Sequence, residues 1–517
     1  MVAALWLATD SLSQNVQFNR YYTMSTWSMG RQVSEIIGKG YYVFGSNNIY
    51  DITSNAENRT ALAMRFNYYG DTIKRWEYSG NDSLMLAHYG FPGEDQLMHG
   101  CIVNDSNLLA VGITQIYNPV SMYDHDILLV MFNSDLDTLW TNTINCPGDS
   151  SIVPYSIIPS QSGGYLIGGH QNNAVNGAFT AFLMKLDANC NVVWHHWYIN
   201  PFQSNVWSIA EAIDGSILYS GSHLQLGGDG DPILFKVDSN GNNPVAVTSY
   251  ASSGDDYGGR IIRASDGDFV QIMSYQAIAA LIPKYVRIVK LSALGNIAFD
   301  KLYVPSYGSC GPTGVIEDTF SPGFVFSGLA QETAAIGGGN PQGFLMKVDE
   351  QGDSLWCRFF GTPLYYTSFW DVTQTSDGGF LMTGQNYCCN FIPQLGGFGA
   401  SLWLVKTDSL GFITTGINDL PGYHLYSMGQ VYPNPANTVL HVPLDIPHAT
   451  AAPATNGLAG NYLYVFDMQG RQLMQQKVQP GNSTAQLDVS TLAPGTYSMV
   501  LVAEGYSISH QKFVVLR

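Results

Sequence analysis

Charged side chains are scarce in this sequence. Asp, Glu, Lys and Arg make up only 12% of its 517 residues, and 22 Lys and Arg stand against 40 Asp and Glu, which gives a formal net charge of −18. A protein that binds nucleic acid or an anionic membrane needs a basic face, so this balance argues against both classes. The low charge also disfavours a fold of helices held together by ion pairs.

Long apolar runs are missing as well. No stretch of about 18 consecutive apolar residues occurs, so the sequence offers no candidate for a membrane-spanning helix. The N-terminal residues 1–14, MVAALWLATDSLSQ, resemble the end of a signal peptide's apolar region followed by small residues, without the basic leader. We expect them to be a secretory signal peptide whose start codon has been placed too late.

Cysteine is too sparse to build the fold. Seven cysteines in a chain of this length do not form a disulfide framework, and their odd number leaves at least one thiol free or paired with another chain. The absence of a CxxC pair argues against a structural zinc site. Cys388 or Cys389 is a candidate partner for Cys310; otherwise these residues are free thiols.

Glycine and aromatic residues are abundant instead. The chain contains 54 Gly, 31 Tyr, 24 Phe and 10 Trp, and apolar residues make up 45% of it. Such a composition favours short strands joined by tight turns, because aromatic side chains suit sheets and Gly suits turns. The length is sufficient for several domains with a sizeable core.

Self-comparison reveals an internal repeat. A short apolar stretch that ends in Gly in most copies recurs seven times, about 57 residues apart. The copies are YYVFG (41–45), LLAVG (108–112), YLIGG (165–169), ILYSG (217–221), FVQIM (269–273), FVFSG (324–328) and FLMTG (380–384).

Each repeat predicts four antiparallel strands, a to d. The apolar stretch is strand b; a short strand a and a tight ab turn precede it, as in RIIRASDGDF (260–269). Strand c and a cd hairpin of the type Asp-x-x-Gly-Asn follow, as in KVDSNGN (236–242). Because the strands are continuously apolar, both faces of each sheet should be buried. We therefore expect an all-β fold with a seven-bladed β-propeller over residues 15–417.

Ring closure needs a further strand, because an open ring exposes sheet edges. Residues 15–22, NVQFNRYY, are similar to the d strands NVVWHHWY and DSLWCRFF. We expect this N-terminal segment to complete blade seven, whose own d candidate (412–417) is short.

The repeat stops near Ile417. After a linker over residues 418–430, the region 431–517 alternates apolar and polar residues between regularly spaced turns. This pattern predicts a half-exposed, immunoglobulin-like β-sandwich after the propeller.

Short motifs in the same region carry a resemblance to a known family. They are a Tyr-Pro-Asn-Pro box, a turn from Asp467 to Arg471, a Pro-Gly-x-Tyr segment and a final strand that reaches a basic residue. The region resembles the type A C-terminal sorting domain of the type IX secretion system of Bacteroidetes. The motif residues are Tyr432, Pro433, Asn434, Pro435, Gly470, Pro494, Gly495 and Tyr497.

This resemblance implies an export route and partners. The precursor would carry a signal peptide, cross the periplasm and leave through an outer-membrane translocon. A sortase would then remove the domain and attach the cargo to surface lipopolysaccharide, or release it. The repeats also resemble propeller cargo that is commonly fused to such domains, which by itself implies no activity.

Catalytic motifs are weak. Gly352-Asp353-Ser354-Leu355 spells a hydrolase nucleophile motif, but it falls in a cd hairpin rather than on a strand-to-helix turn. A sialidase would need an arginine cluster, and inner strands offer only Arg31, Arg260 and Arg263. We predict no catalytic residue, metal or cofactor. Whether any carboxylates among Glu35, Glu211, Glu317 and Asp371 converge stays open at this point.

Two histidine pairs and one acidic loop are the candidate metal sites in the sequence. His195 and His196 should point to opposite faces of a strand, so they cannot bind one ion together. His170 and His223 lie just after strand b in neighbouring blades and could approach each other, but without a third ligand. The loop Gly228–Asp231 supplies two acids where calcium prefers six to eight oxygens.

We expect a secreted or surface-anchored binding module for an extracellular protein or glycan. Alternatives are a polysaccharide-active hydrolase or lyase and a structural surface-layer component. The variable connections should gather around one mouth of the channel, where repeat alignment starts the a strands at Gln32, Gly100, Ser156, Ser208, Arg260, Gly314 and Asp371. Ligand-binding candidates are Arg260, Asp371, His170 and His223, beneath bc loops that contain Asn47, Asn48, Tyr50, Tyr117, Asn118, Tyr123, Asn172, Asn173, Tyr387 and Asn390.

Overall fold

The structure is a computed structural model, and every regular element it describes is a β-strand. No helix in the described part could cross a membrane. The expected signal peptide and linker lie outside the described residues, apart from the last four linker residues. The described residues are 16–51, 56–80, 93–116, 124–145, 150–173, 179–198, 203–224, 230–250, 256–276, 285–303, 310–330, 340–361, 365–392, 397–413, 427–445, 461–467, 471–479, 481, 483–503 and 506–517.

The repeats form four-stranded antiparallel units, named here repeat sheets 1 to 7. Repeat sheets 1 and 7 are joined into one larger sheet by a parallel pair between Trp27 of β2 and Ala400 of β28. Sheet 1 consists of β2 (Trp27–Ile36), β3 (Gly40–Asp51), β4 (Ala56–Phe66) and β5 (Thr72–Tyr78). Sheet 2 consists of β6 (Asp95–Asn104), β7 (Asn107–Gln115), β8 (His125–Asn133) and β9 (Thr138–Ile144). Sheet 3 consists of β10 (Ser150–Pro159), β11 (Tyr165–Asn173), β12 (Phe179–Leu186) and β13 (Val192–Tyr198). Sheet 4 consists of β14 (Gln203–Glu211), β15 (Ile217–Leu224), β16 (Gly230–Val237) and β17 (Val245–Ser249).

The remaining repeat sheets follow the same order. Sheet 5 consists of β18 (Tyr257–Arg263), β19 (Phe269–Tyr275), β20 (Tyr285–Leu291) and β21 (Ile297–Tyr303). Sheet 6 consists of β22 (Cys310–Glu317), β23 (Phe324–Ala330), β24 (Gln342–Val348) and β25 (Ser354–Phe360). Sheet 7 consists of β26 (Thr367–Gln374), β27 (Phe380–Ile392), β28 (Gly397–Thr407) and the N-terminal β1 (Phe18–Tyr22).

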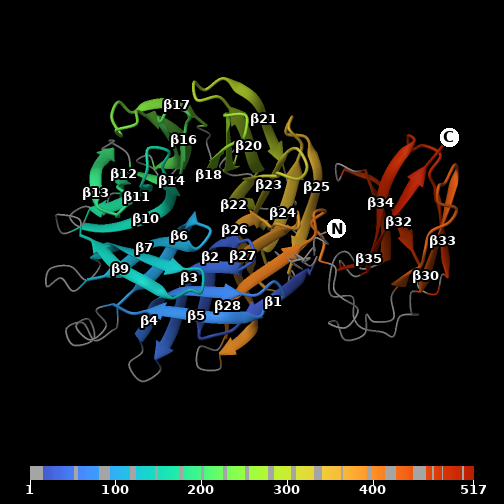
Figure 1. The fold of residues 1–517 in the computed structure, drawn as a ribbon, viewed down its shortest axis with the longest axis horizontal. Helices are drawn as coiled ribbons and strands as arrows, with labels where there is room; N and C mark the ends of the chain where they lie inside the picture. Colours follow the sequence, from blue (N-terminus) through green and yellow to red (C-terminus); the bar gives the residue numbers. More distant parts are fainter. Residues whose placement is uncertain are drawn as a thin grey trace, which may run out of the picture.

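The first strands of the sheets form an inner circle. β2, β6, β10, β14, β18, β22 and β26 each contact the next in this order, and β26 contacts β2 in turn. Figure 1 shows the sheets fanned around a common centre, with these strands inside and the last strands at the rim. The a strands begin earlier than repeat alignment predicted, because up to six residues before the aligned positions also pair with strand b.

Burial on both faces is confirmed for the middle strands. All residues of β8 except the last are buried, and apolar side chains of neighbouring sheets share one core, as Leu109 and Val111 do with Ile167 and Phe182. The cd hairpins have the expected chemistry: the Asp187 carboxylate accepts the backbone N–H of Asn189 and Asn191, both at 2.8 Å.

The N-terminal strand closes sheet 7 as predicted, over the described residues 18–22. β1 pairs antiparallel with β28, from Phe18 opposite Lys406 to Tyr22 opposite Leu402. The Trp403 indole donates a hydrogen bond to the Asn19 side chain at 2.6 Å. β1 also reaches sheet 1, because the Tyr22 ring lies 4.8 Å from that of Phe66.

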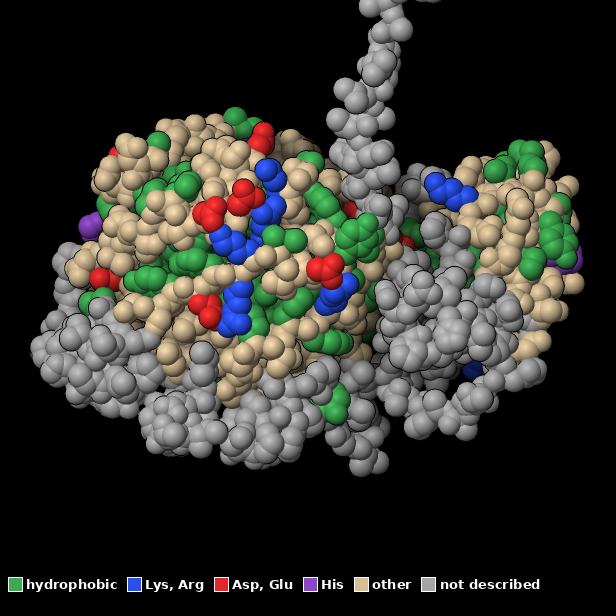
Figure 2. Space-filling view, turned by 60° about the horizontal axis from the view of Figure 1, so that its bottom comes forward, with side chains coloured by type: hydrophobic (Ala, Val, Ile, Leu, Met, Phe, Trp, Pro, Cys, Tyr) green, Lys and Arg blue, Asp and Glu red, His purple; other side chains and the backbone are tan. Residues whose placement is uncertain are grey.

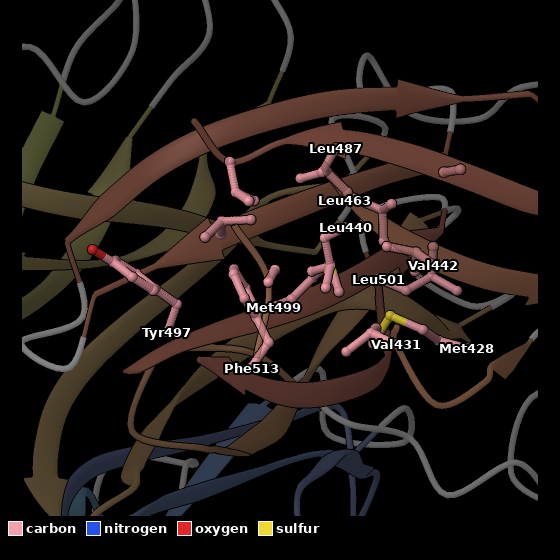
Figure 3. Close-up of a cluster of buried hydrophobic side chains, with 14 of the residues drawn as sticks. Met428, Val431, Leu440, Val442, Leu463, Leu487, Tyr497, Met499, Leu501 and Phe513 are labelled. Carbon is pink, nitrogen blue, oxygen red and sulfur yellow. The ribbon is translucent and has the colours of Figure 1, made fainter. Parts of the chain in front are cut away.

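The C-terminal region forms two further sheets. One has the order β29 (Ser427–Met428), β30 (Val439–Asp445) and β33 (Thr484–Asp488). The other has the order β32 (Gln472–Val478), β31 (Asn461–Phe466), β34 (Gly495–Ala503) and β35 (Tyr506–Val515). Figure 3 shows side chains of both sheets meeting in one apolar core, with Leu440 and Leu487 from the first and Leu463 and Phe513 from the second.

Several basic side chains on the surface are paired with acidic ones. On the face shown in Figure 2, basic side chains lie beside acidic ones on a largely uncharged surface. Exposed ion pairs such as Arg20–Asp71 at 2.8 Å and Arg65–Asp135 at 2.7 Å account for this kind of pattern. Each contributes little to stability, since exposed pairs are typically worth at most about 1 kcal/mol.

Cys101, Cys190 and Cys357 are free thiols that are partly or fully buried. Burial raises the pKa of Cys101 to about 12, of Cys190 to about 11 and of Cys357 to about 12. Thiols with such pKa values are poor nucleophiles at neutral pH. The side chains of Cys388 and Cys389 lie outside the described residues, so their pairing with Cys310 stays a prediction.

Candidate functional site

Every inner strand carries a β-bulge at the same level of the repeat. The register against strand b shifts by one residue in the middle of each a strand, which re-aims the side chains at and beside the bulge. The bulged residues are Arg31, Met98, Tyr155, Trp207, Gly259 with Arg260, Thr313 and Trp370.

A cavity of about 390 Å³ lies between the inner strands, and we name it the axial cavity. Six of the seven repeat sheets contribute lining residues next to their bulges. It continues past strand ends toward the ab turns, where Pro159, Gln161, Glu211 and Arg263 line it. The lining residues beside the bulges are His99, Ser156, Ser208, Arg260, Val315 and Asp371.

Two predicted candidates, Arg260 and Asp371, meet in this cavity. Arg260 donates from Nε to the Thr313 carbonyl oxygen at 3.2 Å, and Asp371 Oδ2 accepts the backbone N–H of Val33 at 3.1 Å. Among the described residues no ion pair joins the two side chains within 4.0 Å. Burial raises the pKa of Asp371 to about 6, although Arg260 and backbone N–H groups act in the opposite direction.

His99 also lines the cavity, and the sequence did not reveal it. Repeat alignment placed Gly100 at this level, whereas the bulge at Met98 brings His99 opposite Val111 instead. Its Nδ1 accepts the backbone N–H of Ile157 at 3.5 Å. Burial, together with the nearby Arg260, holds the pKa of His99 well below its usual value, so the imidazole is neutral at pH 7.

The candidate histidines that the structure describes lie among aromatic rings. His170 is buried between aromatic rings, with Tyr155 at 5.3 Å and Phe179 at 4.6 Å, and burial lowers its pKa to about 4. The side chain of His223 lies outside the described residues. His195 and His196 do face opposite sides, since they pack on Trp197 and Trp194 respectively. The described residues contain no group of three or more potential metal ligands.

Three of the four candidate carboxylates hold turns together. The Glu35 carboxylate accepts the backbone N–H and the hydroxyl of Ser376 at 2.6 and 2.7 Å. Glu211 and Glu317 bind the ab turns at Gln161 and Ser265 in the same way. Each glutamate thus accepts hydrogen bonds from the ab turn of the preceding sheet, which gives its carboxylate a structural role.

The Gly-Asp-Ser-Leu motif is part of a hairpin, as expected. The Asp353 backbone N–H donates to the Asp349 carboxylate at 2.7 Å, and the Asp353 side chain pairs with Lys301 at 2.7 Å. Ser354 starts the rim strand β25, far along the repeat from the inner strands.

Several residues proposed for ligand contact in the bc loops are bound into the fold instead. Asn47 donates to Glu77 at 2.7 Å and accepts from Ser28 at 2.8 Å. The Tyr387 ring packs on those of Trp27 and Tyr366. Tyr117, Asn118, Tyr123 and the side chains of Tyr50, Asn173 and Asn390 lie outside the described residues.

The C-terminal motif residues anchor the chain end. Asn434, in the exposed Tyr-Pro-Asn-Pro box, accepts the backbone N–H of Val514 in β35 at 2.9 Å. The Tyr497 hydroxyl donates to the Ala493 carbonyl oxygen at 2.6 Å, and Arg517 donates to that of Leu492 at 2.8 Å. Gly470 lies outside the described residues. The box and the last strand therefore form one unit.

Comparison with known proteins identifies this C-terminal unit. Residues 430–516 match the family described as the secretion system C-terminal sorting domain. A search of curated proteins finds no match.

The solved structures that match include a polysaccharide lyase and a β-propeller domain. An ulvan lyase matches with 8% identity and a TM-score of 0.47, over 76% of this chain and 96% of its own. The β-propeller domain of the Trilobed protease from Pyrococcus furiosus matches with 9% identity and a TM-score of 0.40, over 77% and 99%. A protein of unknown function from Dyadobacter fermentans matches with 11% identity and a TM-score of 0.42, over 61% and 95%.

The sorting domain implies interaction with the secretion machinery and export to the cell surface or the extracellular space. The chain is an all-β protein with propeller-like repeat sheets that ends in a type IX secretion sorting domain at residues 430–516.

Proposed function

We propose that the exported protein is a seven-bladed β-propeller, residues 15–417, that binds an extracellular glycan or protein in its axial cavity. Residues 418–430 are the linker, and the immunoglobulin-like domain at 431–517 addresses the protein to the translocon and its sortase. The unbroken circle of contacts among the seven inner strands supports the propeller.

The observation that carries the binding role is convergence. Six repeat sheets, far apart in sequence, place polar or small side chains around one cavity. Glu211, the glutamate that lines this cavity, is occupied by the turn at Gln161, whereas the terminal nitrogens of Arg260 have no hydrogen-bond partner among the described residues. A concave site with a few convergent polar groups is the usual form of a ligand site.

A glycan and protein array probed with the isolated propeller tests this proposal. Arg260→Ala and Asp371→Ala should each weaken binding to the array hits by about tenfold or more, because both side chains line the cavity. The matched controls Asp266→Ala and Asp349→Ala change charge in the ab and cd turns and should leave binding within about twofold. Equal effects of the two sets would place the ligand outside the cavity.

A polysaccharide-active enzyme is the second candidate, and one residue favours it. Asp371, with its pKa raised to about 6 by burial, is a group that could exchange a proton near neutral pH. Incubation of each glycan hit with the protein, followed by measurement of new chain ends, separates the two roles. Cleavage that Asp371→Asn abolishes would favour the enzyme over the binder.

A further inference from the structure

Two donors near the bulges have no hydrogen-bond partner. The Arg31 guanidinium lies over the Trp370 ring, with its Cζ 5.1 Å from the ring centroid. Arg31 Nε and Trp370 Nε1 are both buried, and neither has a hydrogen-bond partner among the described residues. A buried donor without an acceptor destabilises the fold, so an acceptor supplied from outside the fold would be bound favourably here.

A second cation, Arg260, stands at the bulge of another inner strand, as Arg31 does in β2. Burial lowers the pKa of Arg31 to about 10; Tyr155 opposes this, while Arg59 and Arg260 act with it. Arg59 is already paired with Glu94 at 3.2 Å. Arg31 donates from Nη2 to the neutral Gln96 side-chain oxygen at 3.4 Å, and Arg260 shares the cavity with Asp371. Neither arginine forms an ion pair within 4.0 Å among the described residues, so both guanidinium groups can bind an added anion.

Flat aromatic surfaces accompany these cations. The Tyr155 and Trp207 rings lie 4.5 Å apart with an interplanar angle of 39°, and all three residues, Tyr155, Trp207 and Trp370, are partly exposed bulge positions. An inorganic anion would need only the guanidinium groups. Aromatic faces beside them suit an anion that is carried on a ring with apolar C–H faces.

We infer that the axial cavity, together with the bulge residues beside it, binds an acidic sugar unit of an extracellular polysaccharide, with the oxyanion between Arg31 and Arg260 and the sugar ring against Trp370 or Tyr155. This inference rests on the proposed function, since the ligand must enter the same axial cavity. A uronate carboxylate and a sulfate ester share the required chemistry, because each has two anionic oxygens that can accept the two N–H groups of one guanidinium group.

Titration calorimetry on the full chain tests the inference with three probes: oligogalacturonate, dextran sulfate oligosaccharides and neutral dextran oligosaccharides of equal length. We expect binding of the carboxylated or the sulfated probe, and their ranking identifies the source of the anion. Arg31→Gln and Arg260→Gln should each weaken that binding by about tenfold or more. The matched control Arg75→Gln removes an exposed arginine of sheet 1, paired with Glu77, and should have no effect.

The outcomes separate the inference from the proposed function. Equal affinity for neutral and acidic probes, unchanged by the arginine variants, overturns the acidic sugar, and so does binding of none of the three. Gln161 lines the axial cavity, so Gln161→Trp should narrow it and weaken binding to the array hits if the ligand binds there. If Gln161→Trp leaves those hits unchanged, the proposed function fails as well. Should Arg31→Gln not fold, Arg31→Lys keeps the charge without the planar fork and should still weaken binding.

Discussion

The cavity changes the acid–base chemistry of Asp371, whose pKa burial raises to about 6. A carboxyl with a folded-state pKa near 6 and an unfolded value near 3.9 binds a proton more tightly in the native state between those pH values. The native state is therefore favoured below about pH 4, and this contribution is lost as the pH rises through 6.

The Asp371→Asn variant tests this sign. It lacks the ionisable group, so at pH 7 it should be more stable than the wild type by roughly 1–3 kcal/mol, and the difference should vanish near pH 4. Urea unfolding at several pH values measures it. An equal stability difference at every pH would contradict the raised pKa.

A carboxyl of the same sheet provides the control. Burial acts against ionisation of Asp377, but Lys406 at 2.9 Å and local hydrogen bonds hold its pKa below the usual value. Asp377→Asn should therefore destabilise the protein at pH 7, since it leaves a buried Lys406 without its partner. The two substitutions in one sheet thus act in opposite directions.

At the scale of elements, the stability of the fold depends on its closing strand, β1. β1 supplies a five-residue ladder to β28 and buries Phe18 between sheets 7 and 1. Deletion of residues 15–22 should expose the edge of β28 and lower the free energy of unfolding by several kcal/mol. Arg20→Ala, which removes only an exposed ion pair, is the control and should cost at most about 1 kcal/mol. An unchanged melting temperature in the deletion would contradict closure by this strand.

The same scale shows how far sequence reasoning reached. The spacing of apolar stretches and Asp-x-x-Gly-Asn hairpins predicted the strands, because hairpin chemistry is local. It did not predict the bulges, which depend on packing between inner strands, and so His99 was missed in favour of Gly100. The sequence leaves Glu35, Glu211 and Glu317 as candidate acids. It does not show that their carboxylates accept hydrogen bonds from the turn of the preceding sheet.

At the scale of the molecule, described residues of the repeat sheets and of the C-terminal unit meet in a small apolar contact. Phe412, just after the last hairpin of sheet 7, packs with Phe466, Val500 and Val502 of the second C-terminal sheet. Arg358 of sheet 6 lies over this contact, with its Cζ 4.2 Å from the Phe412 ring centroid. The two parts otherwise have separate cores, so each should fold without the other.

Removal of the C-terminal unit tests this independence together with the export route. Deletion of Val431–Arg517 should leave the repeat sheets folded, because every strand of those sheets, including the closing β1, lies upstream. The truncated protein should then accumulate in the periplasm, since the sorting domain that implies contact with the secretion machinery is gone. Phe412→Ser in the truncated chain removes the apolar side chain that the deletion uncovers and so guards against aggregation as the cause of retention. Circular dichroism and cell fractionation measure both effects, and a truncated protein that reaches the surface at the normal level would contradict the sorting role.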